Sequence, residues 1–300
     1  MDCEIKPNLF IVGAQKSGST SLYYYLNQHP SVFFSKEKEP RYFNYKYNKN
    51  LQNGPGDRKW DNSRITNFKE YIDLFKNVRD EKIIGEATIE YLYFSEVAQE
   101  LKKFNKNSKI IIILRDPKER AYSAYTHLCR DLRENLSFKD ALLEENKRID
   151  SGYHQIWHYK NVGLYYNQVK TYYDVFGYNN VKVVLYDDLL NNPNNLLVEI
   201  QKFLELEVHS IKTSNKYNQS GIPKNKFIQE IILNDNMVKS TVKKFLPLNI
   251  RNKLRHKAIS MNIEKPKMDS EVRGYLIEFF REDIMKTQNI IGRDLTSWLK

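Results

Sequence analysis

The sequence predicts an α/β fold in which a parallel sheet is flanked by helices on both faces. Short, continuous apolar runs alternate with stretches of helical periodicity, and strands that are apolar on both faces are typical of parallel sheets covered by helices. The predicted strands are Asn8–Gly13, Lys82–Ala87, Lys109–Leu114 and Val181–Tyr186. The predicted helices include residues 17–28, Tyr165–Phe176, a helix opened by Asn192 and Pro193, and Met268–Ile291 with Val272, Leu276 and Phe279 on one face. No linker divides the chain, so we expect one domain spanning residues 1–300.

Composition limits the classes of function. The chain has 300 residues, 41% of them hydrophobic, and a net charge of +11, which suits an anionic ligand such as a nucleotide, a sulfated glycan or nucleic acid. A general preference for lysine explains the charge equally well. With only Cys3 and Cys129, neither a disulfide framework nor a cysteine-ligated metal site is expected. The N-terminus lacks signal-peptide features and no apolar run could span a membrane, so we expect a cytoplasmic location.

The first predicted strand runs into a loop that resembles a phosphate-binding P-loop. In the P-loop pattern G-x-x-x-x-G-K-[ST], the lysine follows the second glycine. Residues 12–21, VGAQKSGSTS, have Gly13, Gly18 and Thr20 in register, but Ser19 occupies the lysine position and the lysine, Lys16, lies inside the loop. A strand–glycine loop–helix unit still directs backbone N–H groups and a helix N-terminus at one spot. The sequence therefore predicts a P-loop-type sheet that binds phosphate with an altered lysine.

A second polar motif follows the clearest strand. In LRDPKERAYSAYTH, residues 114–127, Asp116 is placed to cap a helix whose first residue is Pro117. Arg115 stands at the carboxyl end of the strand, where open α/β sheets bind ligands, and Ser123 lies two turns along the helix. A guanidinium and a hydroxyl form a good site for a terminal phosphate. A nucleotide with phosphates at its 5′ and 3′ ends would occupy both motifs.

Taken together, these motifs resemble those of sulfotransferases that use 3′-phosphoadenosine 5′-phosphosulfate (PAPS). FIVGAQKSGSTSL matches the family's 5′-phosphosulfate loop and ILRDPKERAYSAY its 3′-phosphate motif. Further matches, in order along the chain, are KEPRYF at 38–43, GEATIEYL at 85–92, GLYYNQ at 163–168 and the ending IGRDLTSWLK. The chain looks most like the heparan sulfate and N-deacetylase/N-sulfotransferase branch and its bacterial relatives.

The resemblance implies a role for each site residue. The transferred sulfuryl group carries less charge than a phosphoryl group, so no metal is expected, and Lys16 would neutralise the departing 3′,5′-bisphosphate. Glu39 would be the general base, with Glu86 as the second choice. The 5′-phosphate would be held by Ser17, Gly18, Ser19 and Thr20, the 3′-phosphate by Arg115 and Ser123, and the cofactor would be covered by a loop containing Lys224 and Lys226. The acceptor side would contain Arg41, Glu86 and Ala87, of which Arg41 and Ala87 depart from the residues usual in relatives.

Other functions remain open from the residues alone. A P-loop kinase would need magnesium and a lysine at position 19, and a nucleic-acid-binding module would concentrate its basic residues on one face. The implied acceptor is a carbohydrate or a glycolipid, with a non-carbohydrate small molecule as the alternative. No nucleic-acid partner is expected.

Overall fold

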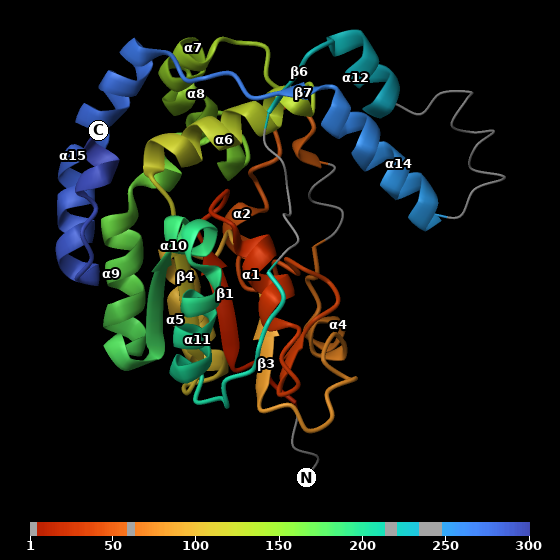
Figure 1. The fold of residues 1–300 in the computed structure, drawn as a ribbon, viewed down its shortest axis with the longest axis vertical. Coiled ribbons are helices and arrows are strands. Elements are labelled where there is room, and N and C mark those ends of the chain that lie inside the picture. The colour runs from red at the N-terminus through yellow and green to blue at the C-terminus, as the bar shows by residue number, and fades with distance from the viewer. Residues whose placement is uncertain (1–4, 59–63, 214–220, 234–247) are drawn as a thin grey trace.

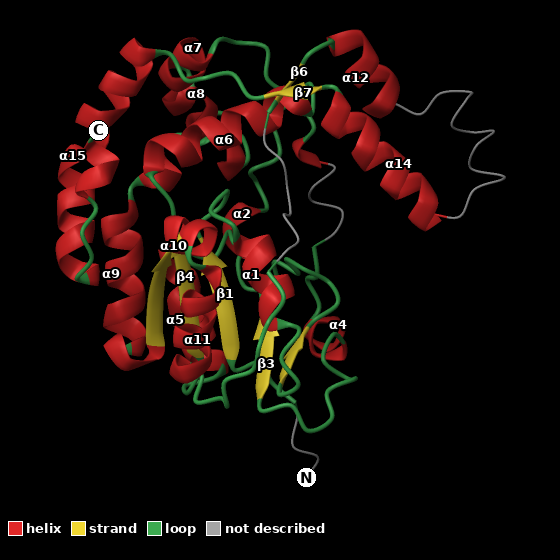
Figure 2. Ribbon diagram, in the orientation of Figure 1, coloured by secondary structure: helices red, strands yellow, loops and turns green. Residues whose placement is uncertain are grey.

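The protein is built around one parallel sheet with a helical layer on each face, as the sequence predicts. A computed structural model describes residues 5–58, 64–213, 221–233 and 248–300 (Figures 1 and 2). The five strands of this sheet are all parallel and lie in the order β2-β3-β1-β4-β5. Their bounds are Val32–Phe34 for β2, Ile83–Glu86 for β3, Leu9–Gly13 for β1, Lys109–Leu114 for β4 and Val181–Leu185 for β5. The short strand β2 is the one that the apolar pattern did not predict.

Alternate residues of the central strands face two separate cores. Phe10 of β1 and Ile110 and Ile112 of β4 belong to a core under α5, α6, α9 and α15. Ile11 and Ile111 belong to the opposite core, under α1 and α11. Because strand residues alternate between faces, β4 can be apolar at every position only when both faces are covered. All of these side chains are fully buried, which confirms the reasoning from continuous apolar runs.

The helices predicted from periodicity are present as α1, α9, α11 and α15, among the described α-helices. Their bounds are Ser19–Leu26 (α1), Tyr45–Asn48 (α2), Phe68–Asp73 (α4), Ser95–Phe104 (α5), Pro117–Arg130 (α6), Phe138–Leu143 (α7), Glu145–Asp150 (α8), Tyr165–Phe176 (α9), Tyr186–Asn191 (α10), Pro193–Phe203 (α11), Lys226–Leu233 (α12), Leu248–Met261 (α14) and Ser270–Ile291 (α15). One prediction in α15 is wrong. Phe279 is 38% exposed and Phe280 is buried, because the α-helical period continues the Val272–Leu276 row at position 280.

The carboxyl ends of the strands form the edge at which the phosphate motifs meet. In Figure 1 the arrowheads of the sheet point toward α6, which crosses above them. A two-stranded ribbon, β6 (Ile222–Pro223) with β7 (Ile263–Glu264), packs beside α6, and α12 and α14 project from it. The part of the chain that contains β6 and β7 therefore lies at the same edge of the sheet as the loop that follows β1. None of the described helices combines the length and the hydrophobicity needed to cross a bilayer.

Candidate active site

The β1–α1 turn has the backbone of a phosphate cradle. Gly18 precedes α1 with φ +95°, and a Cβ there would lie 2.8 Å from Cδ2 of Tyr186, so only glycine fits. Lys16 also has a positive φ, of 66°, which is unfavourable for a residue with a Cβ. No side chain caps the N-terminus of α1, so its first N–H groups point into the turn. The turn therefore directs the backbone N–H groups at the start of α1 to one spot.

The hydroxyl side chains of this loop suit the same ligand. Ser17 and Ser19 are buried, and Ser17 Oγ has no hydrogen-bonding partner among the described residues. A buried hydroxyl without a partner is costly unless a ligand or water satisfies it. Thr20 follows in the first turn of α1. The residues present thus fit a 5′-phosphate, and the structure brings together Ser17, Gly18, Ser19 and Thr20 as the sequence predicts.

Lys16 lies at the centre of a cluster of positive charge. Its ammonium nitrogen is 3.3 Å from Nδ1 of His127, which also accepts a hydrogen bond from Nη2 of Arg130 at 2.8 Å. Burial, followed by the charge of Arg130, lowers the pKa of Lys16 to about 7. Burial and the charge of Lys16 also hold the pKa of His127 well below its ordinary value. A bound anion would raise the pKa of Lys16 again, because a nearby negative charge favours the charged ammonium.

The β4–α6 turn places Arg115 next to the same loop. Nη1 of Arg115 donates to the backbone oxygen of Lys16 at 3.2 Å, and its guanidinium stacks 4.8 Å from the ring centre of Tyr186. Asp116 caps α6 by accepting a hydrogen bond from the backbone N–H of Lys118, with Pro117 at the first position, as predicted. Two phosphate-binding turns on neighbouring strands are therefore tied together by a side chain.

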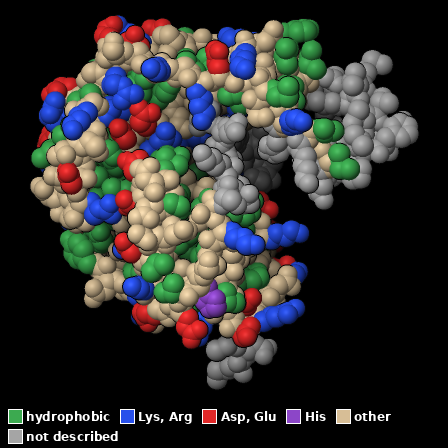
Figure 3. All heavy atoms as spheres, viewed as in Figure 1, with side chains coloured by type: hydrophobic (Ala, Val, Ile, Leu, Met, Phe, Trp, Pro, Cys, Tyr) green, Lys and Arg blue, Asp and Glu red, His purple; other side chains and the backbone are tan. Residues whose placement is uncertain are grey.

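A pocket of about 510 Å³ opens beside Arg115 and Ser123. Its other basic lining residues are Lys265 and Lys267, from the segment after β7, and Arg273 of α15, which pairs with Glu119 at 2.6 Å. Basic side chains are numerous on this upper part of the molecule in Figure 3. The pocket fits a terminal phosphate, and sequence reasoning missed Lys265 and Lys267, whose proximity depends on the pairing of β6 with β7.

The lysines expected to cover the cofactor lie outside that pocket lining. Lys224 donates from Nζ to the backbone oxygen of Met261 at 3.2 Å, and Lys226 is an exposed residue that begins α12. The reason is the antiparallel pairing of β6 with β7, which directs the segment after β7, and not the one after β6, toward Ser123. Part of the loop expected to close over the cofactor, residues 218–220, lies outside the described residues.

Glu39 stands in the loop between β2 and α2, with its side chain 15% exposed. Its carboxylate pairs with the ammonium of Lys38 and accepts a hydrogen bond from Nη2 of Arg41 at 3.1 Å. Glu39 also lies close enough to Lys16 for its charge to raise the pKa of that lysine. The charge of Glu39 is thus a minor influence on the pKa of Lys16, after burial, Arg130, Asp131 and Arg115.

Glu86 and Ala87, which were expected at the acceptor side, are both fully buried. Both oxygens of Glu86 are occupied at 2.6 Å, one by the hydroxyl of Tyr71 and the other by that of Thr88. Burial raises the pKa of Glu86 to about 7. Because β3 ends beneath the loop that holds Glu39, these two residues support that loop from inside and present no surface to an acceptor.

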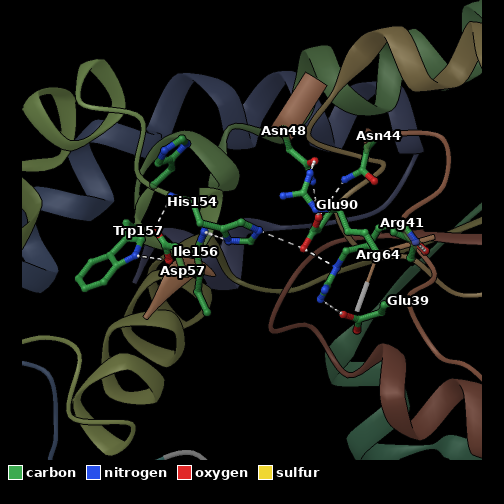
Figure 4. A network of polar contacts seen from close by, with 12 residues as sticks. Glu39, Arg41, Asn44, Asn48, Asp57, Arg64, Glu90, His154, Ile156 and Trp157 are labelled. Atoms are coloured by element: carbon green, nitrogen blue, oxygen red, sulfur yellow. Dashed lines mark hydrogen bonds and ion pairs between the residues drawn. The ribbon is translucent and has the colours of Figure 1, made fainter. Parts of the chain in front are cut away.

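A network of buried charges holds the loop that contains Glu39 and Arg41, which we call the acceptor loop (Figure 4). Glu90 pairs with Nε of Arg41 at 3.0 Å and contacts Nε2 of His154 at 3.3 Å. Asn44 and Asn48 donate to its other oxygen at 2.8 and 3.1 Å. The sequence pattern did not indicate Glu90 or His154, since neither lies in a motif of recognisable spacing. His127 lies one turn beyond Ser123 on α6, and from the sequence a lone histidine at that place is more often structural than functional.

The arrangement offers two turns that suit phosphate groups, at the carboxyl ends of neighbouring strands. Among the described residues, His, Cys, Asp and Glu side chains form no group of three that could hold a metal ion. Chemically, this edge combines the backbone of the β1–α1 turn, a lysine of lowered pKa and the Arg115 guanidinium, with a carboxylate, Glu39, in the loop after β2. Such a site suits transfer of an anionic group from a nucleotide to a neutral nucleophile.

Comparisons with known proteins agree with this chemistry. The model of the sulfotransferase domain matches residues 6–288. A crystal structure of a sulfotransferase from Alicyclobacillus acidocaldarius superposes with a TM-score of 0.80 at 32% identity, covering 99% of this chain and 100% of that one. The fold and the motifs are therefore shared along nearly the entire chain.

Curated relatives are longer proteins. The membrane-associated sulfotransferase kil1 of Dictyostelium discoideum is 34% identical over 131 residues, which are 44% of this chain and 25% of kil1. The bifunctional heparan sulfate N-deacetylase/N-sulfotransferase 3 of Mus musculus is 25% identical over 308 residues, covering 99% of this chain and 32% of the mouse protein. The alignments thus span only a quarter to a third of these relatives. Since the domain model matches nearly the whole chain and the folds agree, the chain belongs to the sulfotransferase family, a family of PAPS-dependent transferases.

Proposed function

We propose that the chain transfers a sulfuryl group from PAPS, in line and without a metal ion, to a hydroxyl or amine of a carbohydrate acceptor. The observation that carries this proposal is the meeting of two strand-to-helix turns at one edge of the sheet, where Nη1 of Arg115 donates to the backbone oxygen of Lys16 at 3.2 Å beside a pocket lined by Arg115 and Ser123. In-line transfer needs an attacking and a leaving group on opposite sides of the sulfur. Glu39 serves the first and Lys16 the second.

The donor side would be held by residues already assembled. Ser17, Gly18, Ser19 and Thr20 would hold the 5′-phosphate, and Arg115 with Ser123 would hold the 3′-phosphate, assisted by Lys265 and Lys267 of the pocket. When bound, PAPS supplies the sulfuryl group and leaves as 3′,5′-bisphosphoadenosine. Two phosphate sites on one edge favour a nucleotide that is phosphorylated at both ends over an ordinary nucleoside triphosphate.

Glu39 and Lys16 would perform the proton and charge chemistry. A bond forms between the acceptor oxygen or nitrogen and sulfur while the bond from sulfur to the bridging phosphate oxygen breaks, and its electron pair stays with that oxygen. Glu39 takes the proton that the acceptor loses, as a general base. Lys16, charged in the presence of the anion, stabilises the negative charge on the departing oxygen. Neither residue needs a metal ion for its role.

A carbohydrate acceptor is favoured by the names of the relatives. They include the mouse heparan sulfate N-deacetylase/N-sulfotransferase and the human heparan sulfate glucosamine 3-O-sulfotransferase 3B1, the latter 26% identical over 204 residues. The acceptor edge of this chain also exposes an aromatic and a basic side chain together, since Arg64 stacks 5.6 Å from the ring centre of Tyr45. Aromatic rings beside hydrogen-bond donors suit the mixed apolar and polar faces of a sugar.

Ligand stabilisation tests the donor half of the proposal. Thermal unfolding is followed with 3′,5′-bisphosphoadenosine, adenosine 5′-monophosphate and ATP with magnesium. We expect the bisphosphate to stabilise the fold most, by about 2.7 kcal/mol at a hundredfold excess over Kd. Preferential stabilisation by ATP with magnesium would support a kinase and would reject the sulfotransferase proposal.

An acceptor screen tests the other half. Sulfate-labelled PAPS is offered with neutral and acidic oligosaccharides, glycolipids and small phenols or alcohols, and labelled products are separated. We expect label in the saccharides or glycolipids. Transfer to the small non-carbohydrate compounds alone would retain the enzyme class and refute the acceptor class.

A further inference from the structure

Glu90 is a buried carboxylate that the proposed transfer leaves without a role. It lies in the segment between β3 and α5, and its side chain is only 1% exposed. Arg41, His154, Asn44 and Asn48 all direct polar groups at its two oxygens. Carboxylates are seldom buried unless they are paired, because burial without partners is costly. Four side chains that direct polar groups at one buried carboxylate fix its position, which indicates that this position matters for the function of the site.

Arg41 connects Glu90 to Glu39. Its Nε lies 3.0 Å from Oε1 of Glu90, and its Nη2 donates to Oε2 of Glu39 at 3.1 Å (Figure 4). The guanidinium is planar and rigid, so fixing one edge of it orients the other. Arg41 is itself buried, with a side chain 6% exposed, and cannot turn freely into solvent. The orientation of the Glu39 carboxylate therefore depends on the anchor behind Arg41.

The backbone of the loop needs such an anchor. Glu39 and Arg41 have φ values of 66° and 57°, in the left-handed region that residues with a Cβ avoid. Conformations of this kind persist where the surrounding structure holds them, commonly at functional sites. The N–H of Arg41 contacts the hydroxyl of Thr88 at 3.4 Å, and that of Phe43 donates to the hydroxyl of Tyr91 at 3.2 Å. The segment that contains Glu90 thus supports the loop from below.

His154 holds Glu90 from the other side. Nδ1 of His154 accepts a hydrogen bond from the N–H of Ile156 at 3.3 Å, so the ring proton is on Nε2, which faces Glu90. The N–H of His154 donates in turn to Asp57 at 2.9 Å. Burial alone would raise the pKa of Glu90, but the charge of Arg41 and the contact with His154 hold it well below its ordinary value. Glu90 is therefore an anion.

We propose that Glu90 is a positioning residue for sulfuryl transfer, which holds the Glu39 carboxylate toward Lys16 through Arg41 and balances the charge of Arg41. This inference rests on the proposed function, because it takes Glu39 as the proton acceptor. Lys38 and Arg41 bring two positive charges to the loop, and Glu39 and Glu90 bring two negative ones. Without Glu90, the charge of Arg41 acts on Glu39 alone, which makes Glu39 a weaker proton acceptor.

A double-mutant cycle tests the proposal. The kcat of Glu90→Gln is measured in the parent and in Glu39→Gln, and binding of 3′,5′-bisphosphoadenosine is measured for all four proteins. Glutamine preserves the shape and removes the charge. We expect Glu90→Gln to lower kcat about tenfold or more in the parent and to change kcat less than twofold in Glu39→Gln. Bisphosphate affinity should stay unchanged, since the partners of the Glu90 carboxylate, Arg41, His154, Asn44 and Asn48, belong to neither phosphate turn.

A matched control separates positioning from general support of the fold. Glu134 is also a buried carboxylate paired with an arginine, Arg148, at 2.6 Å, but it belongs to the segment after α6 and to none of the site contacts. Glu134→Gln should lower the melting temperature without the Glu39-dependent loss of kcat. If Glu90→Gln does not fold, Arg41→Lys breaks the same connection from the other side, because an ammonium cannot bond both carboxylates in the geometry of the guanidinium.

The outcomes distinguish the two proposals. A fall in kcat of the same size in both backgrounds would make Glu90 a structural residue and overturn the inference alone. An unchanged kcat in Glu90→Gln, with a large loss of kcat in Glu39→Gln, would also overturn the inference about Glu90 and leave the proposed function standing. Parental kcat in Glu39→Gln would instead remove Glu39 as the base, and the role of Glu90 with it.

Discussion

The two sides of the site are built in different ways. The donor side consists of two strand-to-helix turns, β1–α1 and β4–α6, each made of consecutive residues and joined by Arg115. The proposed acceptor side is the loop that contains Glu39 and Arg41, both with positive φ, and charges from two distant parts of the chain hold it: Glu90 pairs with Arg41 and also contacts His154. Local backbone geometry shapes the proposed donor side, whereas buried charges from separate parts of the chain hold the proposed acceptor side.

This difference predicts different sensitivities to substitution. Backbone donors remain when a side chain changes, so single substitutions on the donor side should weaken binding in steps. Removing one partner of a buried ion pair leaves the other charge uncompensated, which is strongly unfavourable. Substitutions on the acceptor side should therefore affect turnover sharply while leaving nucleotide binding intact. The following experiments test this contrast between effects on nucleotide binding and effects on turnover.

The largest effect is expected for Glu39→Gln. It retains the shape of the side chain but removes its basicity, so kcat should fall by about 10²–10⁴-fold. Affinity for 3′,5′-bisphosphoadenosine should stay nearly unchanged, because Glu39 belongs to the acceptor loop. Steady-state kinetics and calorimetry measure the two quantities separately.

Two further variants complete that test. Glu37→Gln, two residues away on the same loop and exposed, should be active within a factor of about two. Glu86→Gln should affect stability more than turnover, since Glu86 is fully buried. A large loss of kcat in Glu86→Gln with normal kcat in Glu39→Gln would transfer the base to Glu86.

A smaller, selective effect is expected for Arg115→Ala on the donor side. Loss of a charge-assisted contact to the 3′-phosphate should weaken binding of the bisphosphate by about 10–100-fold. Binding of adenosine 5′-monophosphate, which lacks that phosphate, should weaken less than about threefold. Calorimetry with both ligands decides, and equal weakening would remove Arg115 from the 3′ site.

Lys16 should take up a proton when the donor side is filled. Its pKa of about 7 leaves most of it neutral at pH 8, whereas an anion beside it raises that pKa. Binding of the bisphosphate at pH 8 should therefore consume up to about 0.9 proton, and affinity should fall as pH rises above about 7, by at most about tenfold per unit.

Calorimetry in two buffers of different ionisation enthalpy measures this uptake. Lys16→Arg is the matched control, because a guanidinium stays charged throughout this range. Its binding should be independent of the buffer. If Lys16→Arg takes up as many protons as the parent, another group, such as His127, is the one that titrates.

The smallest effect is expected from metal removal. We expect EDTA to change turnover by less than about twofold, since Ser19 occupies the lysine position of nucleotide-hydrolysing P-loops and Lys16 supplies charge from inside the loop. Rates with EDTA, and after added magnesium, are compared directly. Loss of activity that magnesium restores would contradict the metal-independent mechanism.

From the sequence alone we predict four of the five strands of the parallel sheet and the two strand-to-helix turns, β1–α1 and β4–α6. Apolar runs such as Lys109–Leu114 can be buried only between two helical layers, and Gly18, Asp116 and Pro117 shape the turns through the conformational limits of their own backbones. These preferences are local, so consecutive residues reveal them. The resemblance to sulfotransferases rests on the same contiguous segments, and the match over residues 6–288 confirms it.

Which charged side chains contact one another follows from the tertiary structure and could not be predicted from the sequence. Burial and the charge of Arg130 lower the pKa of Lys16, and the pairing of β6 with β7 brings Lys265 and Lys267 to the pocket beside Ser123. Glu90 contacts Arg41 and His154, which lie far from each other in the sequence. Glu86 and Ala87 lie close in sequence to the expected acceptor side, yet the end of β3 buries both. Electrostatic effects of this kind depend on distance and dielectric surroundings, which no spacing along a chain specifies.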